Sequence, residues 1–330
     1  MRLLNAEITR LSKRRLTWLV LLGMLLFVAL MVASTFLSTR EPSADELAQQ
    51  QLSYQEAVMD WETNGHQMQL DCEEAEARTR AENPTVEINY GCDHMGPPQE
   101  EWYVYQPPVL ADQLRHLGEG SFEVFAMAAL VLGAGFVGAE FVSGSMSTWL
   151  TFEPRRNRVF VTKLTAAGLG VASAALLSYV LLALGTTVVC AINGEGLSLT
   201  TEQFWDFCLP VLRSWAIVTG IGIASASLAF ALRHTAAAIS FGLGSVFLVD
   251  AMLLQIKPKF TPLGLLPNSH AVIDGPYNYS YWTCGGGVSE TSCTTVEKAI
   301  EGPQAVGYLI AVFTLAIMVG FVMFRKRDVD

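Results

Sequence analysis

The sequence predicts an all-α integral membrane protein with six transmembrane helices. Of its 330 residues 51% are apolar, only 16% are charged, and the apolar residues gather in long uncharged runs. A soluble domain carries ~25% charged residues. The composition therefore excludes an ordinary soluble enzyme and a disordered chain. The net charge of −10 argues against a nucleic-acid-binding protein.

An α-helix needs ~20 apolar residues to cross the ~30 Å hydrocarbon core of a bilayer. Several stretches of the sequence meet this requirement, and each has charged residues at or near its ends. Because their number is even, both termini are expected on the same side of the membrane. The six predicted spans are residues 16–39, 121–142, 164–194, 214–232, 235–256 and 302–324.

The positions of Lys and Arg predict the orientation, because cytoplasmic segments of membrane proteins are enriched in both. Of the 21 basic residues, 13 lie on one side, in residues 1–15, 140–163 and 325–330 and at Arg233. Both termini and the 140–163 segment are therefore predicted to be cytoplasmic. The predicted external segments are residues 40–120, 195–213 and 257–301.

Two regions outside the spans have predicted helices of their own. In residues 1–15, the apolar residues Leu3, Leu4, Ile8 and Leu11 share one helical face, which is typical of a helix lying in the cytoplasmic interface. Residues 40–120 are expected to form a large acidic external insertion, since 39–120 contains 17 acidic and 4 basic residues. A capping-box pattern at residues 43–46 starts its predicted helix. Asn64-Gly65 is a candidate break in that helix.

All six cysteines fall in external segments or at an external span end, where the environment is oxidising. An even count there favours disulfides. The simplest of the 15 possible connectivities joins neighbours in the sequence; the alternative is a set of buried thiols. The expected pairs are Cys72–Cys92, Cys284–Cys293 and Cys190–Cys208, and the last is the least supported because Cys190 can be buried in span 3.

One apparent functional motif has a simpler explanation, and another is absent. Gly133, Gly135 and Gly138 match the dinucleotide-binding pattern, but they lie inside a predicted span, where small residues allow close helix packing. The phosphate-binding pattern G-x-x-x-x-G-K-[ST] does not occur. The sequence therefore predicts no catalytic residue, cofactor or metal site on this chain, and any ATPase must be a separate protein.

Asp250 is the only charged residue well inside a predicted span. An ionisable side chain at such depth costs ~3 kcal/mol on insertion scales, so it should face protein or water rather than lipid. Asp250 is accordingly a candidate for the substrate path. The alternative is a salt bridge or hydrogen bond to a neighbouring helix.

The segment 140–163 has the sequence EFVSGSMSTWLTFEPRRNRVFVTK and connects two predicted spans on the cytoplasmic side. It predicts a short amphipathic helix that ends before Pro154, since a residue preceding proline is disfavoured in helices. A basic cluster follows that stop. Such a helix can anchor on acidic lipid or dock into a cytoplasmic partner. Its predicted apolar face is Val142, Met146, Trp149 and Leu150.

The same segment resembles the permeases of type-2 ABC exporters. The resemblance is carried by Glu140, Gly144, Ser145, Leu150, Thr151, Pro154, Arg155, Arg158 and Lys163. The opening residues MRLLNAEITRLSKRRLTWLVLL are similar to actinobacterial members of that family. The resemblance implies a coupling helix that sits in a groove of an ATPase subunit. The residues that it implies for coupling are Glu140, Val142, Met146, Trp149, Leu150, Arg155 and Arg158.

The resemblance also implies partners and a location. The chain would pair with a second copy or a sister permease and would recruit two ATPase chains, which bind ATP and Mg. It would lie in the bacterial plasma membrane, contact membrane lipid and move a lipid, peptide, drug or polysaccharide. The alternative is a polytopic membrane receptor or immunity protein that binds an external ligand through residues 40–120.

Overall fold

The computed structural model describes residues 2–82, 89–107, 109–194, 197–287 and 290–326, without the side chains of residues 2, 117, 119, 253, 284–287 and 290–294. Among the described residues, six helices are long and apolar enough to cross a membrane. They are α2 (Arg15–Thr39), α4 (Leu110–Val142), α6 (Arg156–Ile192), α7 (Thr201–Leu232), the continuous segment Thr235–Ile256, and α11 (Gly302–Lys326).

The predicted spans are therefore all present, but three helices are longer than the apolar runs that predicted them. The second span was expected to start at residue 121, whereas α4 starts at Leu110. Likewise α6 starts at Arg156 and α7 at Thr201. Apolar length measures only the part of a helix that crosses hydrocarbon, and a helix can continue into the polar interface on either side.

The chain divides into two compact units. Unit 1 consists of Met1–Phe36, Val109–Tyr279 and Lys298–Asp330, and unit 2 consists of Leu37–Pro108 and Ser280–Glu297. Unit 1 therefore contains nearly all of the six apolar helices. It also contains α1 (Arg2–Lys13), a short helix that precedes the first span.

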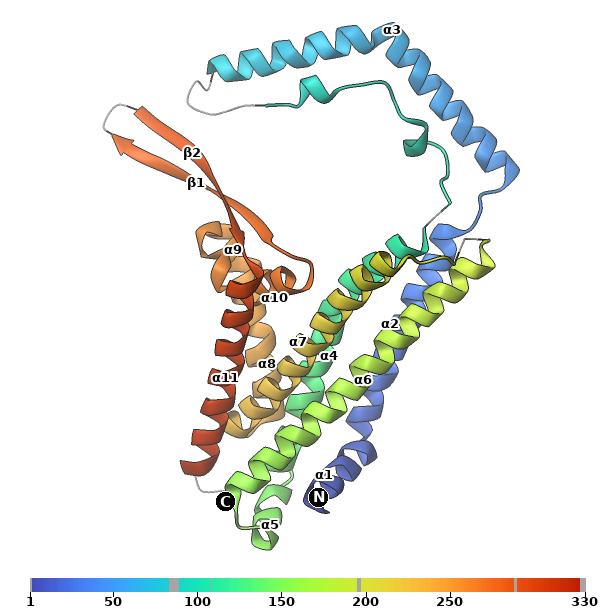
Figure 1. Cartoon of the computed structure of the whole chain (residues 1–330). Coiled ribbons are helices and arrows are strands. Elements are labelled where there is room, and N and C mark those ends of the chain that lie inside the picture. Colours follow the sequence, from blue (N-terminus) through green and yellow to red (C-terminus); the bar gives the residue numbers. More distant parts are fainter. Residues whose placement is uncertain (1, 83–88, 108, 195–196, 288–289, 327–330) are drawn as a thin grey trace. The chain divides into compact units, whose positions relative to one another are not determined.

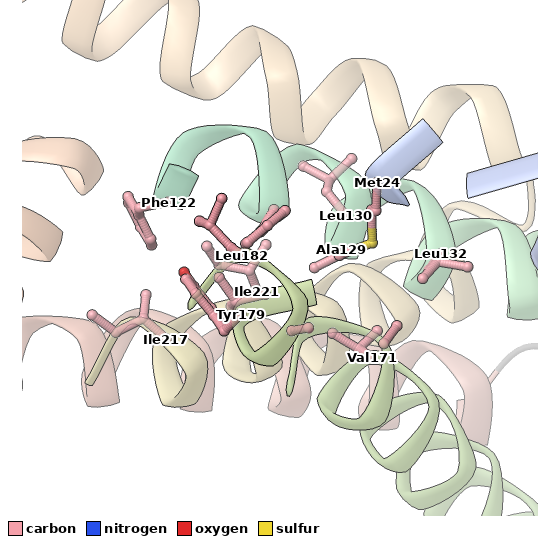
Figure 2. Close-up of a cluster of buried hydrophobic side chains, with 14 of the residues drawn as sticks. Met24, Phe122, Ala129, Leu130, Leu132, Val171, Tyr179, Leu182, Ile217 and Ile221 are labelled. Atoms are coloured by element: carbon pink, nitrogen blue, oxygen red, sulfur yellow. The ribbon is translucent and has the colours of Figure 1, made fainter. Parts of the chain in front are cut away.

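The centre of unit 1 is made by α4, α6 and α7, with α2 packed against them. Phe122 and Phe125 of α4, Tyr179 of α6 and Val218 of α7 are buried in one apolar cluster, part of which is drawn in Figure 2. Gly133 allows the close approach of α4 to α7: a Cβ atom there would lie 2.1 Å from the Gly222 carbonyl oxygen. The glycine pattern in this helix thus serves helix packing.

The end of unit 1 formed by α1, α5 (Ser145–Phe152) and the last turn of α11 is called the basal end below. Figure 1 shows the start of α1 and the end of α11 at this same end. A second apolar cluster, called the basal cluster below, lies here, and it includes Leu11 of α1, Met146 of α5 and Phe324 of α11. Arg156 Nη1, at the start of α6, donates to the Phe324 carbonyl at 3.3 Å.

The fifth span is not a uniform α-helix. It consists of α8 (Thr235–Val246), the π-helical segment η3 (Phe247–Leu253) and the short α9 (Leu254–Ile256). Two further short helices follow: the 3-10 helix η4 (Pro258–Leu263) and α10 (Leu265–Ile273). A π-helical segment inside a membrane helix often marks a functional position, and here it contains Asp250.

The chain is all-α in its membrane spans, and one segment outside them is extended. Strands β1 (Tyr277–Gly287) and β2 (Glu290–Ile300) form a two-stranded sheet within residues 257–301. Strand β1 contains three Tyr and one Trp, strand β2 contains three Thr and one Val, and these residues favour extended backbone. The signal was therefore present in the sequence, although the apolar runs elsewhere dominated the prediction.

Unit 2 is built on α3 (Ala44–Glu82), a single helix that Asn64-Gly65 does not interrupt. The expected capping box is present, since the Glu46 amide donates to Ser43 Oγ at 3.3 Å and the Ser43 amide donates to Glu46 Oε2 at 2.8 Å. The chain after α3 includes the 3-10 helices η1 (Cys92–His94) and η2 (Glu100–Trp102). It is held to α3 by a Cys72–Cys92 disulfide and by the Tyr105 amide, which donates to Gln50.

The other two expected cysteine pairs have different outcomes. Cys190 and Cys208 keep their thiols, so this pairing was wrong. The physical reason is packing: Cys190 is buried in α6 against Leu110 and Leu114 of α4, whereas Cys208 lies on α7 and is partly exposed. The side chains of Cys284 and Cys293 lie outside the described part of the chain, and their pairing stays a prediction.

Candidate functional site

The connection between α4 and α6 forms the predicted short helix at the basal end. The chain leaves α4 at Val142, and Gly144 turns it with a φ of 70°, in the left-handed region that glycine adopts without strain. Helix α5 then runs over eight residues, and Glu153-Pro154 separates it from α6. The sequence thus places a short, sharply bounded helix at one end of the bundle.

One face of α5 packs on the protein's own core. The Met146 side chain is completely buried, and Trp149 and Leu150 pack against the same basal cluster. The apolar face predicted to dock a partner is therefore largely occupied inside the chain. Val142 is exposed, but it belongs to the last turn of α4. This correction follows from helical geometry, because an amphipathic helix beside a bundle places its apolar stripe against that bundle first.

The other face of α5 is open. Thr148, Thr151 and Phe152 are exposed, and the Phe152 side chain is 79% exposed. Arg155 beyond the helix is exposed as well, while Arg158 lies 3.6 Å from Glu153 in an ion pair. Phe152 was not among the predicted coupling residues, because it lies six residues after Met146 and so about 120° from it around the helix. The available signal was that Phe152 is the last residue before Glu153-Pro154, where the helix was predicted to end.

A buried charge network lies behind α5. Lys163 Nζ, at the first turns of α6, lies 2.8 Å from Glu7 Oε2 of α1 and 2.6 Å from Glu140 Oε2 of α4. Arg14 Nη2 donates to Glu140 Oε1 at 2.6 Å. Glu7 and Lys163 are completely buried and Glu140 nearly so. Buried charges are tolerated when they are paired, and these ion pairs join α1, α4 and α6.

Two arginines extend the network to backbone and aromatic groups. Arg14 Nη1 donates to the carbonyls of Gly135 at 3.2 Å and Phe136 at 2.6 Å. Burial lowers the pKa of the Arg14 guanidinium, and the nearby Glu140 charge opposes this. The Arg10 guanidinium lies 3.9 Å from the centre of the Trp149 ring, an arrangement that favours a cation–π attraction. Helix α1 is therefore bonded to α5 and α6, and Arg14, directly after it, is bonded to α4.

Sequence analysis identified Glu140 but not its partners. Glu140 contacts Arg14 and Lys163, and Lys163 also contacts Glu7. Glu7 is the one acidic residue among residues 1–40, which otherwise carry only basic charges. This isolation was the available signal that Glu7 forms an ion pair inside the fold.

At the opposite end of unit 1, Asp250 bonds the start of α10. Its Oδ1 accepts from the Leu265 amide at 3.0 Å and its Oδ2 accepts from the Leu266 amide at 2.9 Å. The first amides of a helix lack partners inside the helix, and a carboxylate satisfies them well. Asp250 therefore accepts hydrogen bonds from a neighbouring helix, which is one of its two expected roles. A role in the substrate path stays a prediction.

His270 of α10 lies between two carboxylates. Its Nε2 is 3.0 Å from Glu123 Oε1 of α4, and its Nδ1 is 3.1 Å from Asp274 Oδ2. The bonds to Asp274 and Glu123 raise the pKa of His270 to about 9. A protonated imidazole therefore joins α10 to α4 near neutral pH. Among the described residues, no group of three or more His, Cys, Asp or Glu has a metal-binding arrangement.

Comparison with known protein families supplies the remaining evidence. Residues 1–329 match the family model described as ABC-2 family transporter protein. The chain belongs to the ABC-2 transporter family. It is accordingly a multi-pass permease subunit of an ABC transporter, and members of this family are generally non-catalytic membrane subunits. No curated protein matches this permease.

Proposed function

We propose that this permease couples ATP hydrolysis by a separate ATPase to the export of a substrate, and that α5 is the contact to that ATPase. In this proposal the basal end is cytoplasmic. The distribution of basic residues supports the orientation, because α1, the chain around α5 and the end of α11 carry most of the Lys and Arg.

The two faces of α5 are the observation that carries the proposal. Phe152 is exposed on a helix whose opposite face is fixed by the buried Met146. An exposed aromatic with threonines beside it suits a protein interface, where aromatic side chains fill pockets of the partner. The alternative role as a lipid anchor is less well supported, because the apolar stripe of α5 is already used by the basal cluster.

Force on α5 would reach the membrane helices through the charge network. Trp149 contacts Arg10 of α1, and α1 is tied to α6 through Glu7 and Lys163. Glu140 joins the end of α4 to the same lysine. A displacement of α5 would therefore move α1, α4 and α6 as a group, as transmission from an ATPase to a transport path requires.

The assembly in this proposal contains two permease chains and two ATPase chains. The second permease is either another copy or a sister protein, and ATP and Mg bind to the ATPases. The substrate class stays open among lipid, peptide, drug and polysaccharide, and the location is the bacterial plasma membrane. The family match favours this function over a receptor that binds ligands through residues 40–120.

The test is co-purification of the permease with the ATPase encoded by an adjacent gene, combined with transport in reconstituted vesicles. Phe152→Ala should weaken ATPase binding by about 30-fold, corresponding to an interface contribution of ~2 kcal/mol. The matched control is Phe204→Ala, which removes an exposed phenylalanine at the start of α7, away from the basal end. Wild-type binding and transport in the Phe152 variant would refute the assignment of α5.

A further inference from the structure

An apolar groove of about 550 Å³ lies beside α1, between α2 and α6. Ile8 and Leu11 of α1, Trp18 and Leu21 of α2, and Leu177 of α6 are among its lining residues. Its volume is within the ~300–1,000 Å³ typical of small-molecule sites. Neither the coupling proposal nor the charge network uses this space.

The groove exists because one face of α6 carries small side chains. Ala166, Gly170 and Ser173 follow one another at the helical spacing of four and three residues, and Leu177 continues the same face. Leu11 approaches α6 at Gly170, where a Cβ atom would lie 2.2 Å from the Leu11 Cδ2 atom. Above and below this contact, small residues leave the space between α2 and α6 unfilled by protein.

The length of the groove matches one leaflet of a bilayer. Its lining residues on α6 extend from Ala166 to Leu177, which is a rise of about 16 Å at ~1.5 Å per residue. Half of a hydrocarbon core of ~30 Å is about 15 Å. The side chains that line an unfilled apolar space lack van der Waals contacts on that side, and in a membrane a lipid acyl chain can supply them.

The end of the groove at α1 contains polar residues and a tryptophan, as is typical at the depth of a membrane interface. Ser12 and Thr17 line it, and Trp18 Nε1 donates to the Ser12 carbonyl at 2.8 Å. Tryptophan is enriched at this depth. The chain between Ser12 and Thr17 contains Lys13 and Arg15, both exposed, whereas the intervening Arg14 is paired with Glu140. Two exposed cations are therefore adjacent in the sequence to the polar residues at this end of the groove, and Lys13 also lines a separate pocket with Arg10 and Glu140.

We propose that this groove holds an anionic phospholipid from the leaflet at the basal end, with one acyl chain along α6 and its phosphate near Lys13 and Arg15. The charge of the connecting segment favours an anionic lipid over a zwitterionic one. The lipid would pack directly against α1, which carries Glu7 and Arg10 of the charge network. The leaflet assignment rests on the orientation in the proposed function, but the site itself does not.

The test uses the full chain in vesicles that contain a phosphatidylglycerol with a diazirine on one acyl chain. After illumination, mass mapping should find adducts concentrated in residues 8–21 and 166–177. Labelling by the matched phosphatidylcholine probe should be at least fivefold lower. The readout needs neither ATP nor the ATPase, so it is independent of the coupling proposal.

Two adjacent residues of α6 provide a matched pair of variants. Leu177 lines the groove and Leu176 does not, although their exposures are similar at 48% and 53%. Leu177→Trp should reduce labelling at least fivefold, and Leu176→Trp should leave it unchanged. Replacing Lys13 and Arg15 by Gln should lower phosphatidylglycerol labelling to the phosphatidylcholine level, which tests the headgroup site without filling the groove. Adducts spread over all exposed helices, or equal labelling by the two lipids, would overturn the proposal.

Discussion

Lys163 Nζ lies 2.6 Å from Glu140 Oε2 and 2.8 Å from Glu7 Oε2, so one completely buried ammonium group pairs with carboxylates from two other helices. Glu140 precedes the turn into α5, and Glu7 lies in the middle of α1. The lysine therefore fixes the position of α5 and α1 relative to α6. Its removal should affect folding before it affects any partner contact.

Lys163→Met should destabilise the permease by about 3–5 kcal/mol, because it removes the cation shared by two buried carboxylates. Glu140 would keep Arg14 at 2.6 Å, but the completely buried Glu7 would keep only the longer contact to Arg10 at 3.9 Å. The measurement is thermal unfolding of the detergent-purified protein, with expression level as a second readout. Adding Glu7→Gln to this variant should restore part of the loss, since it removes the buried carboxylate that is left with the weaker pairing. Lys326→Met, at an exposed site of the same end, is the control and should change stability little. Equal melting temperatures for the two single variants would contradict the role of Lys163.

The six spans could be predicted from the sequence because apolar length alone identifies a helix that crosses hydrocarbon. Short-range patterns also gave α5 and the Ser43–Glu46 capping box. The pairing of Glu140 with Arg14 could not be predicted, since the two residues are 126 apart in the sequence and only tertiary packing brings them together. For the same reason the sequence could not show that Met146 faces the core and Phe152 does not.

The Cys72–Cys92 disulfide should stabilise unit 2. It closes a loop between residues 20 apart, and the chain-entropy model gives ~3 kcal/mol for a loop of this size. Cys92→Ser should therefore increase proteolysis of the chain after α3 under native conditions. Cys208→Ser is the control, because Cys208 keeps its thiol and should leave the cleavage pattern unchanged. Mass mapping without reductant that finds Cys72 and Cys92 alkylated would contradict the bond.

The contact of His270 with Glu123 and Asp274 should make stability depend on pH. Hydrogen bonds to Asp274 and Glu123 raise the pKa of folded His270 to about 9, above its ordinary value of 6.5. A group with a raised pKa contributes fully below the unfolded value and loses its contribution as the pH rises through the folded value. The contribution is therefore complete below pH ~6.5 and is lost as the pH rises through about 9.

His270→Gln should lower the melting temperature most near pH 6, by the equivalent of about 2–3 kcal/mol, and least near pH 10. The measurement is a series of thermal unfolding curves for wild type and variant between these limits. His116→Gln, which changes an exposed histidine of α4, should show no such trend. A difference between wild type and His270→Gln that stays constant over the range would show that the imidazolium charge is not responsible.

Trp149 is the residue whose expected role changes most between sequence and structure. From the sequence it belongs to a surface that docks a partner, but in the fold it packs against the basal cluster and lies under the Arg10 guanidinium at 3.9 Å. Trp149→Ala removes both the packing and the cation–π contact, whereas Trp149→Phe keeps an aromatic face. We expect the alanine variant to lose about 2–3 kcal/mol of stability and the phenylalanine variant less than half of that.

A double-variant cycle with Arg10→Ala separates the two contributions. If the cation–π contact is formed, Arg10→Ala should cost ~0.5–1 kcal/mol more in the wild-type background than once Trp149 is alanine, while its contact to Glu7 is lost equally in both. Trp102→Ala, at a largely exposed tryptophan of unit 2, is the control: it shows how much stability is lost when a poorly packed indole is removed. Additive losses for Arg10 and Trp149 would remove the link between α1 and α5. Displacement of α5 would then have to reach the membrane helices through Glu140 alone.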